Sequence, residues 1–63
     1  MRDKVIIALD VDSAEKARAL VAALGDAADF YKIGLELYAA AGPEFVRELV
    51  GSGKQVFLEF ADE

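Results

Sequence analysis

The sequence predicts an α/β fold, a (βα)₂β unit with three parallel strands and two main helices. Short apolar runs alternate with segments of helical periodicity along the 63 residues, and no linker or low-complexity stretch interrupts them. Strands that alternate with helices favour a parallel sheet with right-handed crossover connections. The pattern therefore predicts a single (βα)₂β domain over residues 1–63.

The first strand is predicted at residues 5–9, and a helix follows it over Ala14–Leu24. The strand sequence, VIIAL, is short, continuously apolar and largely β-branched, which is typical of a strand covered on both faces. Asp12 with Glu15 three positions later forms a capping-box pattern that starts the helix. Gly25 ends it, because a residue without Cβ is best tolerated there. The apolar stripe of this helix consists of Ala17, Leu20, Val21 and Leu24.

The second half of the chain repeats the alternation. Phe30–Gly34 is predicted as the second strand, and the stretch Leu35–Ala41 after it is helix-prone. Pro43 suits the first position of a second main helix, which extends over residues 43–50. Its apolar face consists of Phe45, Val46, Leu49 and Val50. Residues 55–60 then form the third strand.

The composition excludes several classes of protein. With 56% hydrophobic residues the chain is too apolar to be disordered. A net charge of −5 and a pI of about 4.5 disfavour nucleic acid or an anionic membrane surface as partners. The chain has no cysteine and no histidine, so we expect neither a disulfide nor a metal site. No apolar run approaches a membrane span and the amino terminus shows no signal-peptide pattern, which predicts a cytoplasmic protein.

The small size predicts a partner. A chain of 63 residues buries only roughly 60% of the surface that it exposes when unfolded, so its own core is marginal. Natural chains of this size usually add disulfides, a metal or a partner subunit. The first two are not expected here, and we therefore predict a homo-oligomer.

Alternation along the three strands groups three charged residues. Asp10, Lys32 and Glu59 each lie near the carboxyl end of a predicted strand, and they can share one face of the sheet. Ligands of parallel α/β folds bind at the carboxyl ends of strands, so a lysine between two carboxylates is a candidate site. The alternative is that these charges are solvated strand ends that align by chance.

Four segments together carry a resemblance to a known family. They are IALD at residues 7–10, DFYKIGLEL at residues 29–37, AGPE at residues 41–44 and VFL at residues 56–58. At their spacing they resemble orotidine 5′-phosphate decarboxylases. The resemblance implies a partial TIM barrel and a cofactor-independent carboxy-lyase that converts orotidine monophosphate to uridine monophosphate in pyrimidine biosynthesis. It also implies that Asp10 contacts the ribose and that Lys32 belongs to the charged network around the reacting carboxylate.

The sequence departs from that family at the catalytic motif. The third strand of the family ends in Asp-x-Lys-x-x-Asp, whose first aspartate corresponds to Glu59 here and whose proton-donating lysine corresponds to Ala61. The last aspartate would lie beyond Glu63, and the phosphate-binding loops belong to later strands. The resemblance thus implies that Lys32 and Glu59 are vestigial catalytic residues, and we expect these 63 residues to be inactive on their own.

Two other functions stay open. The first is an engineered or excised structural barrel module with no catalytic role, which self-associates through an apolar face that its own helices leave uncovered. This face consists of Ile6, Ala8, Phe30 and Phe57. The second is a module of Rossmann type, which is disfavoured because the first strand leads into Asp12 and Ser13 and not into a glycine-rich phosphate loop. If the chain binds a ligand at all, we expect a nucleotide monophosphate, bound weakly.

Overall fold

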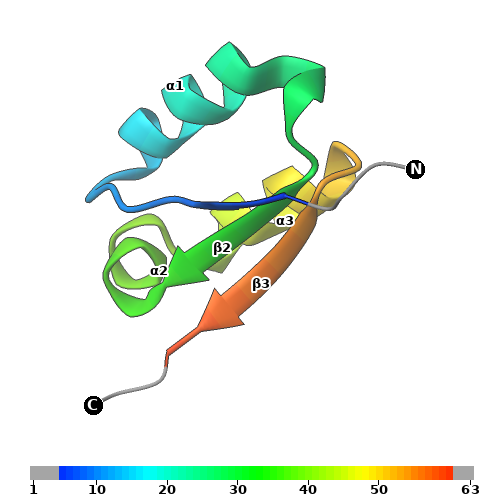
Figure 1. Ribbon diagram of the computed structural model, residues 1–63. Helices are drawn as coiled ribbons and strands as arrows, with labels where there is room; N and C mark the ends of the chain where they lie inside the picture. Colours follow the sequence, from blue (N-terminus) through cyan, green and yellow to red (C-terminus); the bar gives the residue numbers. More distant parts are fainter. Residues whose placement is uncertain (1–4, 61–63) are drawn as a thin grey trace.

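A computed structural model describes residues 5–60, which form three strands and three helices (Figure 1). The elements in order are β1 (Ile6–Ala8), α1 (Ala14–Leu24), a 3₁₀ turn η1 (Gly25–Ala27), β2 (Phe30–Gly34), α2 (Leu35–Ala41), α3 (Pro43–Gly51) and β3 (Gln55–Glu59). The predicted α/β class is confirmed. The helix-prone stretch after β2 is a helix of 7 residues in its own right.

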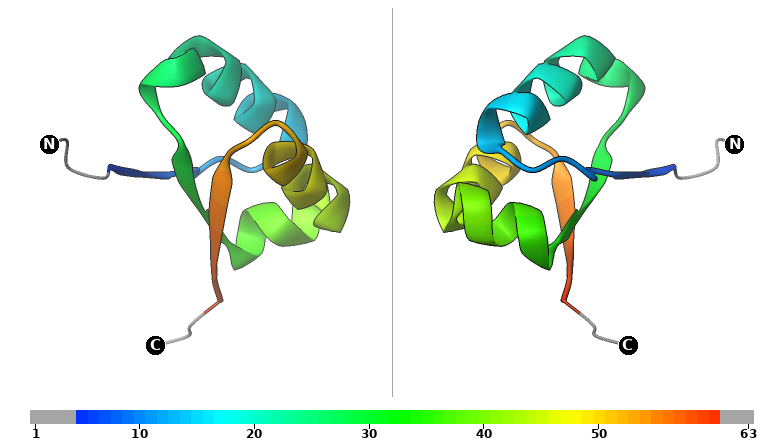
Figure 2. Two further views of the ribbon diagram at one scale, coloured as in Figure 1. Left: turned by 90° about the vertical axis from the view of Figure 1, so that its right-hand side faces the viewer. Right: turned by 90° about the vertical axis from the view of Figure 1, so that its left-hand side faces the viewer.

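The three strands form one parallel sheet in the order β1-β2-β3. The register pairs Ala8 with Lys32 and Lys32 with Phe57, so these three side chains form one row across the sheet. Figure 2 shows all the helices on one side of the strands. The sheet therefore has a covered face, which packs on the helices, and an open face, which carries no layer of the described chain.

The core lies between the covered face and the helices. Tyr31 and Ile33 on β2 and Ala17 of α1 are fully buried, and Phe45 of α3 is only 1% exposed. Alternate residues of the same strand point to the open face, and for that reason Lys32 is only half-buried. Both α1 and α3 thus cover the sheet with the apolar stripes that the sequence indicates.

The stripes are narrower than predicted at their margins. Leu20 of α1 is 36% exposed and Val50 of α3 is 56% exposed, although both were expected to face the core. Both residues lie at the margin of a helical stripe, where a side chain packs less completely than those at its centre, such as Ala17 and Phe45. The first strand is also shorter than predicted, and Val5 is 59% exposed.

The start of α1 differs from the predicted cap. Ser13, and not Asp12, is the N-cap: its Oγ accepts a hydrogen bond of 3.1 Å from the backbone N–H of Lys16. A serine hydroxyl at this position satisfies one of the free amides of the first turn. Asp12 instead pairs with the Lys16 side chain, Oδ1 to Nζ 3.0 Å. The predicted stop is confirmed, since Gly25 has φ +52° directly after Leu24.

A lysine ties the amino end of the sheet together. Lys54, just before β3, donates from Nζ to the carbonyl oxygens of Gly25 and Ala28, both at 2.9 Å. Its Nζ also lies 3.8 Å from Asp29 Oδ1, and only 13% of its side chain is exposed. Lys54 thereby joins the start of β3 to the connection between α1 and β2, a segment far from β3 in sequence.

Candidate functional site

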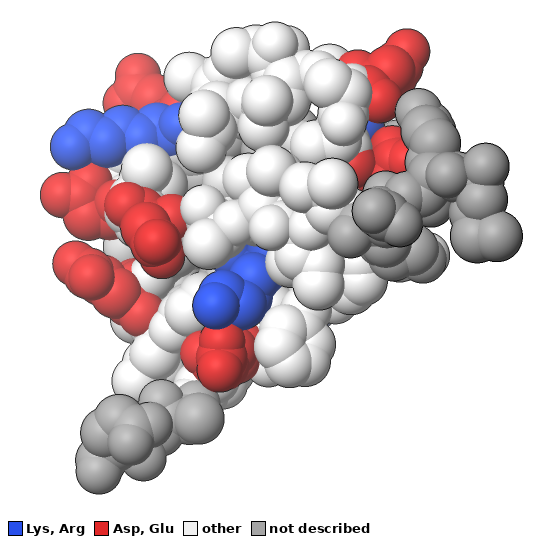
Figure 3. Space-filling view, in the orientation of Figure 1, with Lys and Arg blue, Asp and Glu red and all other residues white. Residues whose placement is uncertain are grey.

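Lys32 and Glu59 meet at the carboxyl end of the open face. Nζ of Lys32 lies 3.0 Å from Oε1 of Glu59, and 39% and 47% of the two side chains are exposed. Parallel register explains the contact: Gly34 lies opposite Glu59, so Lys32 is two residues away on the same face of the neighbouring strand. Figure 3 shows one blue side chain touching a red one within a broad white area over the strands. The structure thus brings two of the three predicted site residues together.

Asp10 takes a separate place near this pair. It follows β1 on the open-face side of the alternation, is exposed, and takes part in none of the salt bridges found within residues 5–60. It lines a hollow of about 290 Å³ between the end of β1 and the start of α2. The predicted group of three charges is therefore an ion pair between Lys32 and Glu59, with Asp10 as a second carboxylate outside the pair.

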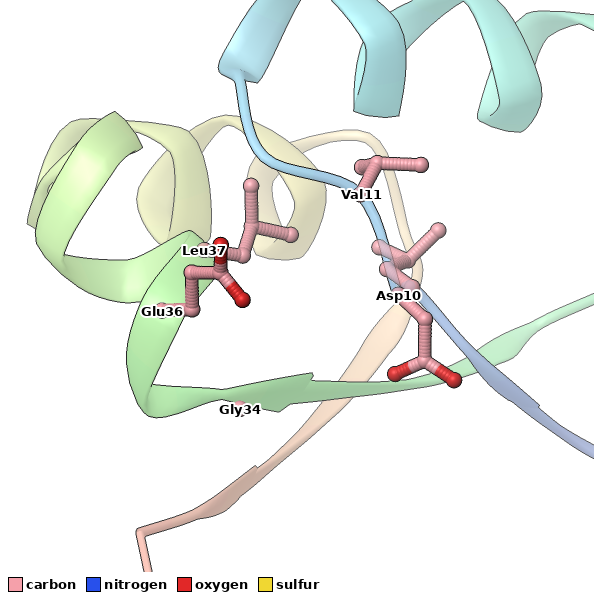
Figure 4. A pocket seen from close by; sticks show the side chains of 6 residues that line it. Asp10, Val11, Gly34, Glu36 and Leu37 are labelled. Atoms are coloured by element: carbon pink, nitrogen blue, oxygen red, sulfur yellow. The ribbon is translucent and has the colours of Figure 1, made fainter.

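The hollow has an apolar wall and two carboxylates. It is lined by Leu9, Asp10, Val11, Gly34, Glu36 and Leu37. Figure 4 shows Asp10 on the β1 side and Glu36 on the α2 side of the hollow. Glu36 was not among the site residues that the sequence predicted. Its position in the first turn of α2, directly after the strand that carries Lys32, was the signal that could have found it.

The arrangement can recognise a small polar molecule. Ionised carboxylates only accept hydrogen bonds, so Asp10 and Glu36 suit hydroxyl groups, while the Lys32 ammonium suits an anionic or carbonyl oxygen. Within residues 5–60 no group of three or more metal-ligating side chains exists. In the same part of the chain no helix is long and apolar enough to span a membrane. Ala61 and its predicted role lie outside the described residues.

The fold and the charged residues near the carboxyl ends of the strands together define a class of protein. The chain is a segment of a parallel α/β barrel. Comparison with known proteins narrows this class. The model of the Orotidine 5'-phosphate decarboxylase / HUMPS family matches residues 3–62. The chain therefore belongs to this family, which has the TIM-barrel fold, and its (βα)₂β unit is a partial barrel.

Curated relatives support the same assignment. The chain is 52% identical over 59 residues to the orotidine 5'-phosphate decarboxylase of Nitrobacter winogradskyi, a match that covers 94% of this chain and 25% of the relative. It is 53% identical over 57 residues to that of a Caulobacter species, covering 90% and 25%. It is 52% identical over 58 residues to that of Methylorubrum extorquens, covering 92% and 25%. The chain thus spans about a quarter of the relatives it matches.

Proposed function

We propose that these 63 residues form the ligand-facing first segment of an orotidine 5′-phosphate decarboxylase barrel. By themselves they do not decarboxylate orotidine monophosphate. In this proposal Asp10 and Lys32 bind a nucleotide monophosphate weakly, and Lys32 and Glu59 are the remains of the catalytic network. The observation that carries the proposal is the 3.0 Å ion pair between Lys32 and Glu59 on the open face, with alanine at position 61.

The chemistry explains why activity is not expected. Loss of CO₂ leaves a developing negative charge on carbon, which must be stabilised and then protonated by a positioned group. The methyl group of Ala61 can do neither. Lys32 lies on β2, the neighbouring strand, and its ammonium is already engaged by Glu59.

An absorbance assay tests the catalytic half of this proposal. The chain and its Ala61→Lys variant are incubated with orotidine monophosphate, and the loss of substrate absorbance is followed. We expect no turnover by the unaltered chain. Measurable decarboxylation by that chain would contradict the proposal, whatever the variant does.

A titration tests the binding half. Backbone amide spectra of the labelled chain are recorded with increasing uridine monophosphate. We expect the amides of Asp10, Lys32 and Gly34 to shift, whereas that of Lys54, at the opposite end of the sheet, stays in place. The variant Lys32→Met should lose these shifts. Lys16→Met, which removes an exposed lysine paired on helix α1, should retain them. Unchanged spectra of the unaltered chain would contradict the binding half.

A second candidate function is structural. The open face exposes apolar side chains, with Ile6 51% and Phe57 48% exposed. This favours a barrel module, engineered or excised from a longer barrel, that works by association without any ligand.

We also propose a cytoplasmic location, in keeping with the acidic composition and with the location expected for nucleotide chemistry. Fractionation of cells that produce the chain tests it: recovery of the chain with membranes would contradict the assignment.

A further inference from the structure

A largely buried lysine connects the starts of β2 and β3. Lys54 directly precedes β3, and its Nζ donates to the carbonyl oxygens of Gly25 and Ala28, both at 2.9 Å. The next residue, Gln55, donates from its backbone N–H to the carbonyl oxygen of Asp29 at 2.7 Å. Ala28 and Asp29 are the two residues before β2. The lysine therefore holds the start of β3 against the start of β2.

We propose that Lys54 is a positioning residue for Glu59, although the two lie at opposite ends of β3. By fixing where β3 starts beside β2, the lysine selects the register that places the Glu59 carboxylate next to Lys32. The proposal assigns a role to a residue far from the ligand-facing end of the sheet. It rests on the proposed function only in its consequence for nucleotide binding.

The register carries the position of the strand starts to the ion pair. β2 and β3 pair one to one along all 5 residues of each strand, from Phe30 with Gln55 to Gly34 with Glu59. An offset that is set at the first pair is therefore kept at the last. Lys32 is two residues before Gly34 and shares its face, so its Nζ reaches Oε1 of Glu59 at 3.0 Å.

Alternation along the strand does not select this register by itself. A slip of β3 by one residue would turn its side chains to the other face, which the apolar pattern resists. A slip by two residues keeps every side chain on its face and moves Glu59 by about 7 Å along the strand, away from Gly34. The turn into β3 contains Gly51 and Gly53, and glycine adopts more backbone conformations than other residues, so the turn does not fix the start of β3 either.

The bonds of Lys54 are suited to hold a register. A charged donor makes shorter and stronger hydrogen bonds than a neutral one, and both bonds end on backbone carbonyls, whose places do not change with side-chain rotamers. Only 13% of the lysine side chain is exposed. Asp29 contributes less, because its Oδ1 lies 3.8 Å from Nζ and 74% of its side chain is exposed.

A chemical rescue tests the role of Lys54. The chain contains no cysteine, so Lys54→Cys introduces a single thiol. Alkylation of this thiol with 2-bromoethylamine in denaturant, followed by refolding, restores an ammonium group on a side chain as long as that of lysine. Lys54→Gln, which is shorter and uncharged, is a second variant. Ser13→Ala is the control, because it removes the N-cap bond to Lys16 and weakens α1 without touching β3.

Two measurements by nuclear magnetic resonance report the register in molecules that circular dichroism shows to be folded. They are the Overhauser contact between Gly34 and Glu59 and the hydrogen exchange of the β3 amides. In Lys54→Cys we expect the contact to be lost and the β3 amides to exchange at least about tenfold faster. Alkylation should restore both. Ser13→Ala should keep the contact and the slow exchange of β3.

A folded Lys54→Cys chain that keeps the contact would overturn the proposal, because a residue that only stabilises the fold leaves the register of folded molecules unchanged. A loss that alkylation does not reverse, or an equal loss in Ser13→Ala, would also overturn it. If Lys54→Cys does not fold, Lys54→Gln decides by the same contact. Failure of both to fold would show a role in folding and not in register, again against the proposal.

Nucleotide binding is a separate consequence. Where the unaltered chain binds uridine monophosphate, Lys54→Cys should bind it more weakly and the alkylated chain should recover, because Glu59 then returns to its place beside Lys32. An unaltered chain that does not bind this nucleotide would contradict the proposed function, while the contact between Gly34 and Glu59 would still decide the role of Lys54.

Discussion

The two faces of the sheet are built from alternate residues of the same strands, yet they have opposite environments. On the covered face Tyr31 and Ile33 are fully buried, whereas on the open face Phe57 is 48% exposed. Both faces are rich in apolar residues, so hydrophobicity alone does not decide burial. What decides it is whether another layer of the chain reaches that face, and the helices of this chain all lie on one side (Figure 2).

The largest expected effect is a difference in stability between two truncated phenylalanines, one beneath the covered face and one on the open face. Phe45 of α3 is 1% exposed and packs against the covered face. Phe45→Ala should lower the free energy of unfolding by about 3–5 kcal/mol, which leaves so small a chain largely unfolded. Phe57→Ala, on the open face, should cost no more than about 1 kcal/mol, because its ring is already 48% exposed. Urea unfolding followed by circular dichroism measures both. Comparable losses for the two variants would show that the open face is covered in the monomer.

The two lysines at opposite ends of the sheet give the next largest difference. Lys54 donates to two backbone carbonyls and is 13% exposed, whereas Lys32 has one carboxylate partner and is 39% exposed. Lys54→Met should lower the free energy of unfolding by about 1.5–3 kcal/mol, because it leaves those carbonyls without a charged donor. Lys32→Met should change it by less than about 1 kcal/mol, as for other exposed ion pairs. Thermal unfolding of the two variants side by side measures this difference, and a larger loss for Lys32→Met would contradict it.

The sequence predicted the order of the elements better than it predicted which apolar side chains are buried. The parallel order and β2 follow from local pattern, because alternation and helical periodicity are properties of neighbouring residues. The exposure of Leu20 and Val50 does not, because it depends on how far the sheet extends beneath each helix. At the site, strand alternation predicted the Lys32–Glu59 contact, but Asp10 and Glu36 meet the same hollow only through the path of the chain after β1 and β2. Such a path depends on loop conformation, which no periodic pattern encodes.

The covered face contains one polar group that its surroundings do not satisfy. Within residues 5–60, the hydroxyl of Tyr31 is buried and has no hydrogen-bond partner. A buried polar group without a partner costs free energy, so Tyr31→Phe should raise the free energy of unfolding by about 1 kcal/mol. Tyr38, which is partly buried and contacts the ring of Phe60, is the control: Tyr38→Phe should leave stability nearly unchanged. Loss of stability in Tyr31→Phe would show that its hydroxyl is satisfied.

The same tyrosine predicts a pH dependence. Burial, and to a smaller extent the negative charge of Asp29, raise the pKa of Tyr31 above its ordinary value of 10.0. A group whose pKa is raised on folding contributes full stability below its unfolded pKa, and this contribution is lost as the pH rises toward the folded pKa. The chain should therefore lose stability above about pH 10, and Tyr31→Phe should lose less of it. Melting temperatures recorded across the alkaline range test this, and identical profiles for the two proteins would contradict it.

The smallest effect belongs to the exposed end of α1, outside both faces. A hydrogen bond from Lys16, and then the positive charge of Lys16, lower the pKa of Asp12 below its ordinary value of 3.8. A carboxyl group whose pKa is lowered on folding contributes stability above its unfolded pKa and loses it as the pH falls through the folded pKa. Asp12→Asn should thus lower the melting temperature slightly at neutral pH and not at all in strong acid. Because the pair is exposed, added salt should shrink the difference, whereas the effects at Phe45, which is buried, and at Lys54, whose side chain is only 13% exposed, should persist. If Asp12→Asn rivalled those variants, surface charge and not the covered layer would govern the stability of this segment.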